Sequence, residues 1–314
     1  KFDTDEGRIT AIENVSLTLD QGKVLGIVGE SGSGKSVTAK SIMQLNPGNT
    51  IYNDNAEIII DDENVLKFTS KNDLKKIRGG KVSMIFQEPM ASFAPAIKIG
   101  NQMVEQLLLH KDLDKHKAKS ISIDMLNRVG IADAEKRFNQ YAFELSGGMR
   151  QRAMIAMALS TMPKLLLADE PTTALDVTIQ AQVINLMKDI IKEFNMGVIF
   201  ITHDLGVIAQ VADDVAVMYL GSVVERGPVN EILKNPKHPY TKGLLNALPD
   251  INNLDAPLKP IPGNIPSPLE RPTGCVFRTR CPNPTHDCKE GNIEMGLIEV
   301  EPGHWVDQCC VNCG

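Results

Sequence analysis

The segment that most restricts the fold of this chain is a glycine-rich loop that follows a short apolar run. Residues 24–28 read Val-Leu-Gly-Ile-Val, which is typical of a buried strand, and residues 29–36 read Gly-Glu-Ser-Gly-Ser-Gly-Lys-Ser. The loop matches the G-x-x-x-x-G-K-[ST] pattern in full, and a helical pattern follows it. Such strand–loop–helix units bind phosphate, because glycines let backbone N–H groups point at the anion and the helix directs its positive end there. The sequence therefore predicts a nucleotide-binding α/β fold.

The loop residues have separate tasks in holding a nucleotide. Lys35 brings a positive charge to the β- and γ-phosphates, and the Ser36 hydroxyl is a suitable ligand for Mg²⁺. A glycine-rich turn with a chance lysine is the alternative, but the strand–loop–helix context favours the phosphate site. The predicted nucleotide-binding positions of the loop are Gly29, Ser31, Gly32, Ser33, Gly34, Lys35, Ser36 and Val37.

Polar residues at the ends of two later apolar runs supply the other half of a catalytic site. Asp169 and Glu170 follow the run 165–168, and His203 follows the run 198–201. Parallel sheets bind ligands at the carboxyl ends of their strands, so these residues should face the loop. We expect Asp169 to bind Mg²⁺ through water, Glu170 to orient or deprotonate the attacking water, and His203 to contact the γ-phosphate or that water. Solvated acids and a structural histidine are the alternatives.

Short apolar runs alternate with longer amphipathic stretches through the first 248 residues. In residues 178–194, for example, apolar side chains recur at helical spacing. Strands that alternate with helices indicate a parallel sheet with crossover helices. Residues 96–143 hold no strand-like run and predict a helical subdomain. The predicted strands are residues 24–28, 82–86, 165–168, 198–201 and 215–218.

Charge and hydropathy exclude several classes of protein. The chain has 314 residues, with 33 Lys and Arg against 39 Asp and Glu, and a net charge of −6. A dedicated nucleic-acid-binding protein would usually carry a basic stripe instead. No apolar run approaches the ~18 residues of a membrane-spanning helix. No charged-then-apolar segment of the secretory kind opens the chain.

Proline and cysteine concentrate after residue 249. Ten of the 18 prolines lie between Pro249 and Pro302, and residues 257–268 are too rich in proline for a regular helix. We therefore predict a linker followed by a small appended module. Because the rest of the chain has no cysteine, the local cluster indicates a metal site rather than a disulfide scaffold. The six cysteines are Cys275, Cys281, Cys288, Cys309, Cys310 and Cys313.

A second glycine-rich motif, Leu-Ser-Gly-Gly-Met at residues 145–149, precedes the acid pair. By itself it fits either a phosphate-binding turn that opens a helix or a helix N-cap with a glycine hinge. Together with the loop at 29–36, it resembles the LSGGQ-type signature of the ATP-binding cassette (ABC) family, with Met149 in the usual Gln position.

Other elements of the ABC family appear in the expected order. Gln87 matches the Q-loop, Asp176 the D-loop and His203 the H-switch. Phe2 is the best match to the aromatic residue that stacks on adenine. The resemblance covers residues 2–235 and implies ATP and Mg²⁺ as ligands. The residues that it implies as Mg²⁺ ligands are Ser36, Gln87 and Asp169.

The resemblance also implies a fold and a mechanism. The fold is an α/β P-loop ATPase with a parallel-sheet core, an antiparallel β layer from residues 1–25 and 56–62, a helical subdomain and a C-terminal extension. Two cassettes pair head to tail, and the signature of each contacts the nucleotide of the other, so one chain alone has no complete site. ATP binding closes the pair and hydrolysis releases it. The signature residues that would contact the partner's nucleotide are Ser146, Gly147, Gly148 and Met149.

The chain after residue 235 resembles a narrower group, the oligopeptide/dipeptide/nickel importer ATPases. The segments that match their extension are 238–245, 262–266 and 274–282. This resemblance implies an ATPase that drives uptake of di- or oligopeptides at the cytoplasmic face of the membrane, bound there peripherally. Its partners would be a second ATPase, related or identical, two permease subunits and an external peptide-binding protein, with no nucleic acid. The cargo, whether peptide or nickel chelate, is not encoded in this chain.

These matches divide the chain into three parts. Residues 1–87 and 146–248 should form the ATPase core, residues 88–145 the helical subdomain, and residues 249–314 the proline-rich linker and metal-binding module.

In some members of this group, four tail cysteines bind a [4Fe–4S] cluster. Cys275, Cys281 and Cys288 match that pattern, and we expect Cys309 as the fourth ligand, with Cys310 as the alternative. The gaps between them are wider than the two-residue gaps of zinc knuckles. Zinc and unliganded thiols remain the alternatives. A structural staple for a short module is favoured over redox chemistry, because the sequence shows no other redox centre.

Two other functions compete with import. ABC ATPases of DNA repair or of the ribosome share the cassette, and a regulatory ATPase could use the cysteine tail as a redox sensor. The net charge of −6 and the extension at 238–245 speak against nucleic acid. The complete set of Lys35, Asp169, Glu170 and His203 indicates that hydrolysis is the primary activity.

Overall fold

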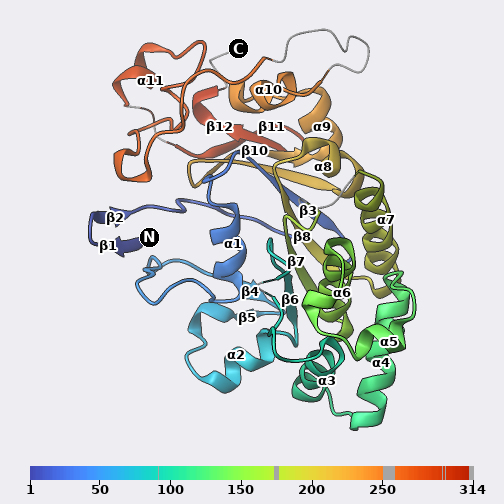
Figure 1. Cartoon of the computed structure of the whole chain (residues 1–314). Coiled ribbons are helices and arrows are strands. Elements are labelled where there is room, and N and C mark those ends of the chain that lie inside the picture. The colour runs from blue at the N-terminus through green and yellow to red at the C-terminus, as the bar shows by residue number, and fades with distance from the viewer. Residues whose placement is uncertain (91, 173–176, 250–258, 292, 294, 311–314) are drawn as a thin grey trace.

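The computed structural model describes all residues except 91, 173–176, 250–258, 292, 294 and 311–314 (Figure 1). Its centre is an eight-stranded sheet in the order β11-β12-β10-β9-β3-β8-β7-β6. The five strands predicted from apolar runs form the parallel part of this sheet. These strands are β3 (Val24–Val28), β6 (Val82–Ile85), β7 (Leu165–Asp169), β8 (Gly197–Thr202) and β9 (Asp214–Tyr219).

Both faces of the parallel strands are covered, which explains why these strands are apolar throughout. In β3, Leu25 and Ile27 belong to the core on one face, where helix α1 (Lys35–Ile42) packs. Val24 and Val28 belong to the core on the other face, which includes α6 and α7. Figure 1 shows α1 on one side of the sheet and these two helices on the other.

Helices α3, α4 and α5 form a group at one end of the molecule (Figure 1). Met103, Leu107, Met125 and Leu126 form its buried centre, which confirms the predicted helical character of residues 96–143. In the described part of the chain, no helix has the length and apolar character of a membrane span. The helices after α1 are α2 (Lys71–Ile77), α3 (Ile99–His110), α4 (Lys115–Arg128), α5 (Ala134–Phe138), α6 (Gly147–Ser160), α7 (Val177–Phe194), α8 (Leu205–Val211), α9 (Val229–Lys234), α10 (Pro239–Asn246) and α11 (His286–Glu290). The 3-10 helices are η1 (Val65–Lys67), η2 (Ala142–Glu144), η3 (Pro268–Glu270) and η4 (Gln308–Cys310).

The antiparallel strands near the N-terminus are shorter than the predicted layer. Strands β1 (Phe2–Thr4) and β2 (Gly7–Ile9) form one hairpin, and β4 (Ile59–Ile60) and β5 (Glu63–Asn64) form another. The two hairpins are separate sheets. Val24 and Leu25, which the prediction placed in the antiparallel layer, belong to the parallel sheet because β3 lies between β8 and β9.

The end of the chain returns to the main sheet. Strand β10 (Ser222–Pro228) runs antiparallel to β9, β12 (His304–Asp307) pairs with β10, and β11 (Leu297–Glu301) pairs with β12. This pairing satisfies the backbone groups that β10 would otherwise expose at the sheet edge. The predicted boundary near residue 249 is therefore not a break in the sheet, and the tail packs against the body instead of forming a separate module.

Candidate nucleotide-binding and catalytic site

The glycine-rich loop at residues 29–36 connects the buried strand β3 to helix α1. At Gly29, an added Cβ would lie 2.1 Å from the carbonyl oxygen of Met218 in β9. Gly34 has a φ of 97°, and an added Cβ there would lie 2.8 Å from the carbonyl oxygen of Ala11. Larger residues are therefore excluded at both positions, and the loop keeps the tight turn that an anion-binding loop requires.

Lys35 is the buried cation of this loop. Its Nζ donates to the carbonyl oxygens of Gly29 at 2.8 Å and Glu30 at 2.9 Å. Burial lowers the pKa of Lys35, and the carboxylates of Glu170 and Asp169 act in the opposite direction. Phosphate oxygens would make charge-assisted bonds with this ammonium group, which are stronger than its bonds to neutral carbonyls. The geometry thus suits the exchange of carbonyl oxygens for phosphate.

Ser36 and Asp169 form the oxygen-rich part of the site. The Ser36 Oγ donates to Asp169 Oδ1 at 3.1 Å. Asp169 ends β7 and is only 3% exposed, and burial raises the pKa of its carboxyl group. A hard divalent cation prefers such oxygen donors and would offset the burial of the carboxylate. The two residues therefore fit Mg²⁺.

Glu170 is the meeting point of two other predicted catalytic residues. The Gln87 Nε2 donates to Glu170 Oε2 at 3.2 Å, and the His203 Nδ1 lies 3.2 Å from Oε1. Glu170 has a φ of 48°, a left-handed conformation that is costly for a residue other than glycine and typical of functional sites. Its backbone N–H donates to the carbonyl oxygen of Ile201 in β8 at 2.9 Å, which helps to hold this turn. In this structure Gln87 is bonded to Glu170 and not to Ser36 or Asp169.

The position of His203 follows from the residue after it. Asp204 is the N-cap of α8, and its carboxylate accepts bonds from the backbone N–H groups of Gly206 and Val207. This cap defines the sharp turn from β8 into α8. His203 is left at the strand end, where 58% of its side chain is exposed. It can therefore meet a substrate that binds over the loop.

A cavity of about 210 Å³ lies over the loop. It is lined by loop residues 31–37 together with Gln87 and Glu170, so most of the predicted nucleotide-binding and catalytic residues come together here. The other lining residues carried no local signal, because they reach the cavity from distant segments of the chain. They are Ile9, Thr10, Ala11, Leu220, Gly221 and Pro268.

The signature motif lies elsewhere. Ser146 is the N-cap of α6, and its Oγ accepts a bond from the Met149 N–H at 3.3 Å. Ser146 and Gly147 are exposed, and the described lining of the cavity includes none of the residues 146–149. The motif therefore presents a helix N-terminus at the surface, away from the loop of its own chain. The predicted D-loop residue, Asp176, lies outside the described residues.

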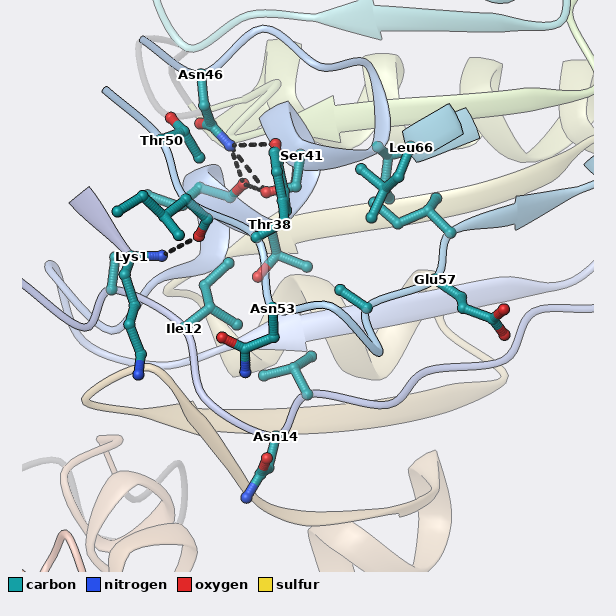
Figure 2. A pocket seen from close by; sticks show the side chains of 18 of the residues that line it. Lys1, Ile12, Asn14, Thr38, Ser41, Asn46, Thr50, Asn53, Glu57 and Leu66 are labelled. Carbon is teal, nitrogen blue, oxygen red and sulfur yellow. Dashed lines mark hydrogen bonds between the residues drawn. The ribbon is translucent and has the colours of Figure 1, made fainter. Parts of the chain in front are cut away.

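Phe2 does not join the group around the loop. It lies in β1, forms a bridge with Thr50, and lines a neighbouring cavity of about 500 Å³ (Figure 2). Its lining includes the charged side chains of Lys1 and Glu57 and neutral polar groups such as the Asn46 amide, which donates to Ser41 Oγ at 2.8 Å. Val37 lines both cavities, whereas Phe2 lines the larger one and is absent from the described lining of the cavity over the P-loop. The structure therefore does not bring Phe2 together with the P-loop residues, and its stacking on adenine stays a prediction.

The tail cysteines approach one another from separate segments. A hydrogen bond with the Cys309 thiol, together with burial, raises the pKa of the Cys275 thiol. Burial also raises the pKa of Cys281, and the neighbouring thiols of Cys275 and Cys288 act in the same direction. The sulfur atoms of Cys309 and Cys310 lie 3.4 Å apart. Five sulfurs in one mostly buried region suit a soft metal ion or an iron–sulfur cluster.

A buried histidine adjoins these sulfurs. The ring of His238 lies within 4.8 Å of the sulfurs of Cys309 and Cys310. Its Nδ1 accepts a bond from the Tyr240 N–H at 3.0 Å, and burial lowers its pKa to about 3. The neutral ring therefore carries its hydrogen on Nε2, so Nε2 is not available as a metal ligand and can instead donate toward sulfur. The donor set of this region is accordingly one of thiols.

Two family models match this chain. One, described as ABC transporter, matches residues 12–173, which is more than half of the chain. The chain belongs to the ABC transporter family. The second, described as the C-terminal region of oligopeptide/dipeptide transporters, matches residues 224–288 of this ABC protein.

Individual ABC proteins are similar over most of the chain. The oligopeptide transport ATP-binding protein AppD of Bacillus subtilis is 49% identical over 282 residues, which cover 89% of this chain and 85% of AppD. The dipeptide transport ATP-binding protein DppD of the same organism is 45% identical over 314 residues, covering 99% of this chain and 91% of DppD.

A solved structure supports the same fold and activity. The dimeric ATP-binding cassette MJ0796, in a post-hydrolysis state with ADP and Pi, has a TM-score of 0.65 and 26% sequence identity. The match covers 73% of this chain and 94% of that one. The protein is thus an ATPase of the ABC type, with ATP and Mg²⁺ as its ligands.

Proposed function

We propose that this ABC ATPase is the ATP-binding subunit of an importer of di- or oligopeptides. The observation that carries the proposal is the match of residues 224–288, outside the common cassette, to the C-terminal region of oligopeptide/dipeptide transporters. Relatives named for oligopeptide and dipeptide transport cover 89% and 99% of this chain, which supports the same cargo class.

The proposed hydrolysis uses the two halves of the site. Lys35 and the backbone N–H groups of the P-loop bind the β- and γ-phosphates. Ser36 and Asp169 would hold Mg²⁺, which neutralises charge that develops on the phosphate oxygens. The protein's own contribution is to fix the triphosphate in line with the attacking water.

Glu170 is the residue that we assign to that water. Its carboxylate can orient the water or accept its proton. The contact of Glu170 with Gln87 and His203 supports a common task for the three side chains. Gln87 would couple the presence of the γ-phosphate to the conformation of the permeases. His203 would contact the γ-phosphate once ATP is bound.

A second cassette completes the site in this proposal. Ser146 and Gly147 of the signature are exposed, and the described lining of the chain's own cavity lacks residues 146–149, as expected if the signature contacts the nucleotide of a partner. We propose head-to-tail pairing with a related chain, and a homodimer is the alternative outcome of the test below.

The remaining partners are those of an importer. We propose two permease subunits that form the pathway and an external peptide-binding protein that delivers the cargo. The chain would bind the permeases peripherally at the cytoplasmic face of the membrane. The helical subdomain, residues 88–145, would supply the contact, because it begins directly after Gln87.

We further propose that the tail holds a [4Fe–4S] cluster. Cys275, Cys281, Cys288 and Cys309 would be the ligands, with Cys310 as the alternative to Cys309. These thiols come together from separate segments, which supports the assignment, because a metal group would link the segments. Metal binding would also stabilise the thiolate forms that burial and the neighbouring thiols disfavour. Zinc in the same donor set is the alternative.

The test is to purify the tagged chain from detergent-solubilised native membranes and to identify the proteins that come with it. The proposal expects two permeases and a second cassette, whose sequence distinguishes a heterodimer from a homodimer. ATP hydrolysis by the reconstituted complex should then rise with added peptide and binding protein. Recovery of ribosomal or DNA-repair proteins without a membrane subunit would contradict transport.

A further inference from the structure

Glu30 belongs to the P-loop but is absent from the described lining of its cavity. Each of its polar groups has a partner. The backbone N–H donates to the Tyr240 hydroxyl at 2.8 Å, and the carbonyl oxygen accepts the bond from Lys35 at 2.9 Å. The carboxylate accepts bonds from the Arg280 guanidinium. The Gly29–Glu30 peptide, whose carbonyl oxygen accepts a bond from Lys35 at 2.8 Å, is therefore bonded by Tyr240, and the Glu30 side chain is bonded by Arg280.

Arg280 makes a bidentate contact with the Glu30 carboxylate. Its Nη1 lies 2.7 Å from Glu30 Oε2 and its Nη2 lies 3.2 Å from Oε1. The same guanidinium group donates to the carbonyl oxygens of Pro262 at 3.0 Å and Ile261 at 3.2 Å. Only 3% of the Arg280 side chain is exposed. The Glu30 side chain is 30% exposed, so the guanidinium group is buried and the carboxylate is half-buried. A bidentate pair is selective for the planar guanidinium group, so a lysine cannot reproduce it.

Tyr240 and Arg280 form one packed unit. Tyr240 lies on α10 and is fully buried, and its ring centre lies 5.4 Å from that of Phe277. Phe277 is in the same tight turn as Arg280, because its carbonyl oxygen accepts the Arg280 N–H at 2.9 Å. That turn also carries Cys275 and Cys281. The two segments that contact Glu30 thus pack against each other through Tyr240 and Phe277, in the same core as the tail cysteines.

We propose that Tyr240 and Arg280, which we name the P-loop brace, are positioning residues for ATP binding. Tyr240 fixes the Gly29–Glu30 peptide through the Glu30 N–H, and the Gly29 carbonyl oxygen of this peptide accepts a bond from Lys35 beside the cavity. Arg280 neutralises a carboxylate that belongs to the phosphate-binding loop itself. Neither residue touches the nucleotide site directly, and both act through Glu30.

The sign of the effect follows from the charges. ATP carries several negative charges, and an unpaired Glu30 carboxylate beside the P-loop would repel it. With Arg280 in place, the pair is close to neutral and the repulsion is cancelled. Loss of the arginine should therefore weaken ATP binding, and removal of the Glu30 charge should reverse part of that loss. A residue that only stabilises the fold would show no such reversal.

The experiment measures the Kd of a fluorescent ATP analogue, with Mg²⁺, on the purified full chain below its unfolding temperature. Arg280→Met is expected to raise Kd about tenfold, because the half-buried Glu30 carboxylate is left without its cationic partner beside the P-loop. The double variant Arg280→Met with Glu30→Gln should recover most of that loss. Tyr240→Phe, which removes a single oxygen, should raise Kd about threefold. Arg280→Lys should fall between the wild type and Arg280→Met.

Matched controls separate positioning from folding. Arg278→Met alters an arginine of the same turn whose guanidinium group bonds to the carbonyl oxygens of Cys288 and Lys289 instead of Glu30. Its Kd should stay within twofold of the wild type, whatever happens to the Tm. Two results would overturn the brace: a Kd for Arg280→Met within twofold of the wild type, or no recovery with Glu30→Gln. If Arg280→Met does not fold, an unchanged Kd for Tyr240→Phe overturns it alone.

Discussion

Glu170 lies where three parts of the chain meet. It follows strand β7, bonds to Gln87 after β6, and contacts His203 after β8. Its left-handed φ of 48° is held by the bond from its N–H to Ile201. A strained residue with two polar neighbours is suited to place one carboxylate oxygen where a water attacks.

The first prediction concerns this carboxylate. Glu170→Gln keeps the shape of the side chain and its contact with Gln87 but cannot accept a proton, so hydrolysis should fall by roughly 10²–10³-fold while ATP still binds. Phosphate release by the assembled transporter measures the rate, and size-exclusion chromatography with ATP should show a trapped closed pair. Glu135→Gln, at an exposed acid of α5, is the control. Turnover near the wild-type rate would remove Glu170 from this role.

The second prediction concerns pH and His238. Burial lowers the pKa of His238 from 6.5 to about 3. Between these two pH values the ring is neutral in the folded protein but binds a proton in the unfolded chain. Stability is thus present above pH 6.5 and declines as the pH falls toward 3. Between pH 7 and 5.5 this residue should lower the free energy of unfolding by about 1 kcal/mol.

The control for this effect is His238→Asn, which can still accept the Tyr240 N–H as an N-cap but does not titrate. Urea unfolding of both proteins at the two pH values gives the comparison. The decline in the free energy of unfolding should be smaller in the variant. Equal declines would show that another group is responsible.

At the scale of elements, the site depends on the order of the parallel strands. Strand β8 lies between β3 and β7, so the P-loop, the acid pair and His203 emerge at the same edge of the sheet. Helix α6 behaves differently, since its N-terminus is capped by Ser146 and residues 146–149 are not among the described residues that line the cavity over the P-loop. The capping role of the Ser146 hydroxyl and its proposed contact with a partner's nucleotide can therefore be tested as separate roles.

The third prediction separates these roles. Ser146→Asp retains a good N-cap acceptor, so the free energy of unfolding should stay within about 0.5 kcal/mol of the wild type. The added negative charge should nevertheless abolish hydrolysis by the assembled pair, because it would face the partner's nucleotide. Ser146→Ala removes the N-cap acceptor without adding a charge, so it should lower the free energy of unfolding by about 1 kcal/mol and reduce hydrolysis less than Ser146→Asp does. Thermal unfolding and phosphate release measure the two effects, and normal turnover by Ser146→Asp would contradict head-to-tail pairing.

At the scale of the whole molecule, the tail is tied to the ATPase body at several points. Strand β12 extends the central sheet, Arg280 and Tyr240 reach the P-loop, and Cys275 contacts Cys309 across the tail. The cysteine region thus lies within the same packed core as the sheet. If a metal group is bound there, its loss should lower the free energy of unfolding of the entire chain.

The fourth prediction tests that group. Anaerobically purified protein should contain about four iron and four sulfide per chain if the cluster is [4Fe–4S]. Cys288→Ser should lose most of the iron and lower the Tm by several degrees. Cys310→Ser is the matched control and should keep its iron if Cys309 is the fourth ligand. Stoichiometric zinc without iron would replace the cluster by the alternative, and absence of both metals would refute a metal site.

The local sequence was sufficient to predict the phosphate-binding loop and the strands and helices around it. The loop at 29–36 requires glycine and lysine at set positions, and buried parallel strands are continuous apolar runs, so both are visible without tertiary information. The helical spacing of residues 178–194 likewise predicts helix α7 within a residue of its start. These features are short-range, because their physical requirements lie within a few residues of one another.

Contacts between distant segments were decided only by the tertiary structure. Nothing near Glu30 indicates that Arg280 and Tyr240 hold it, and the proline-rich region that suggests a boundary is followed by strands that rejoin the main sheet. Phe2 likewise lies in a hairpin against Thr50 and not over the P-loop. Such contacts depend on the pairing of β12 with the edge of β10 and on the packing of side chains from distant segments in one core. The sequence by itself therefore determined an ABC-type ATPase, because its motifs are local, whereas only the tertiary structure showed that side chains of the tail contact Glu30 in the P-loop.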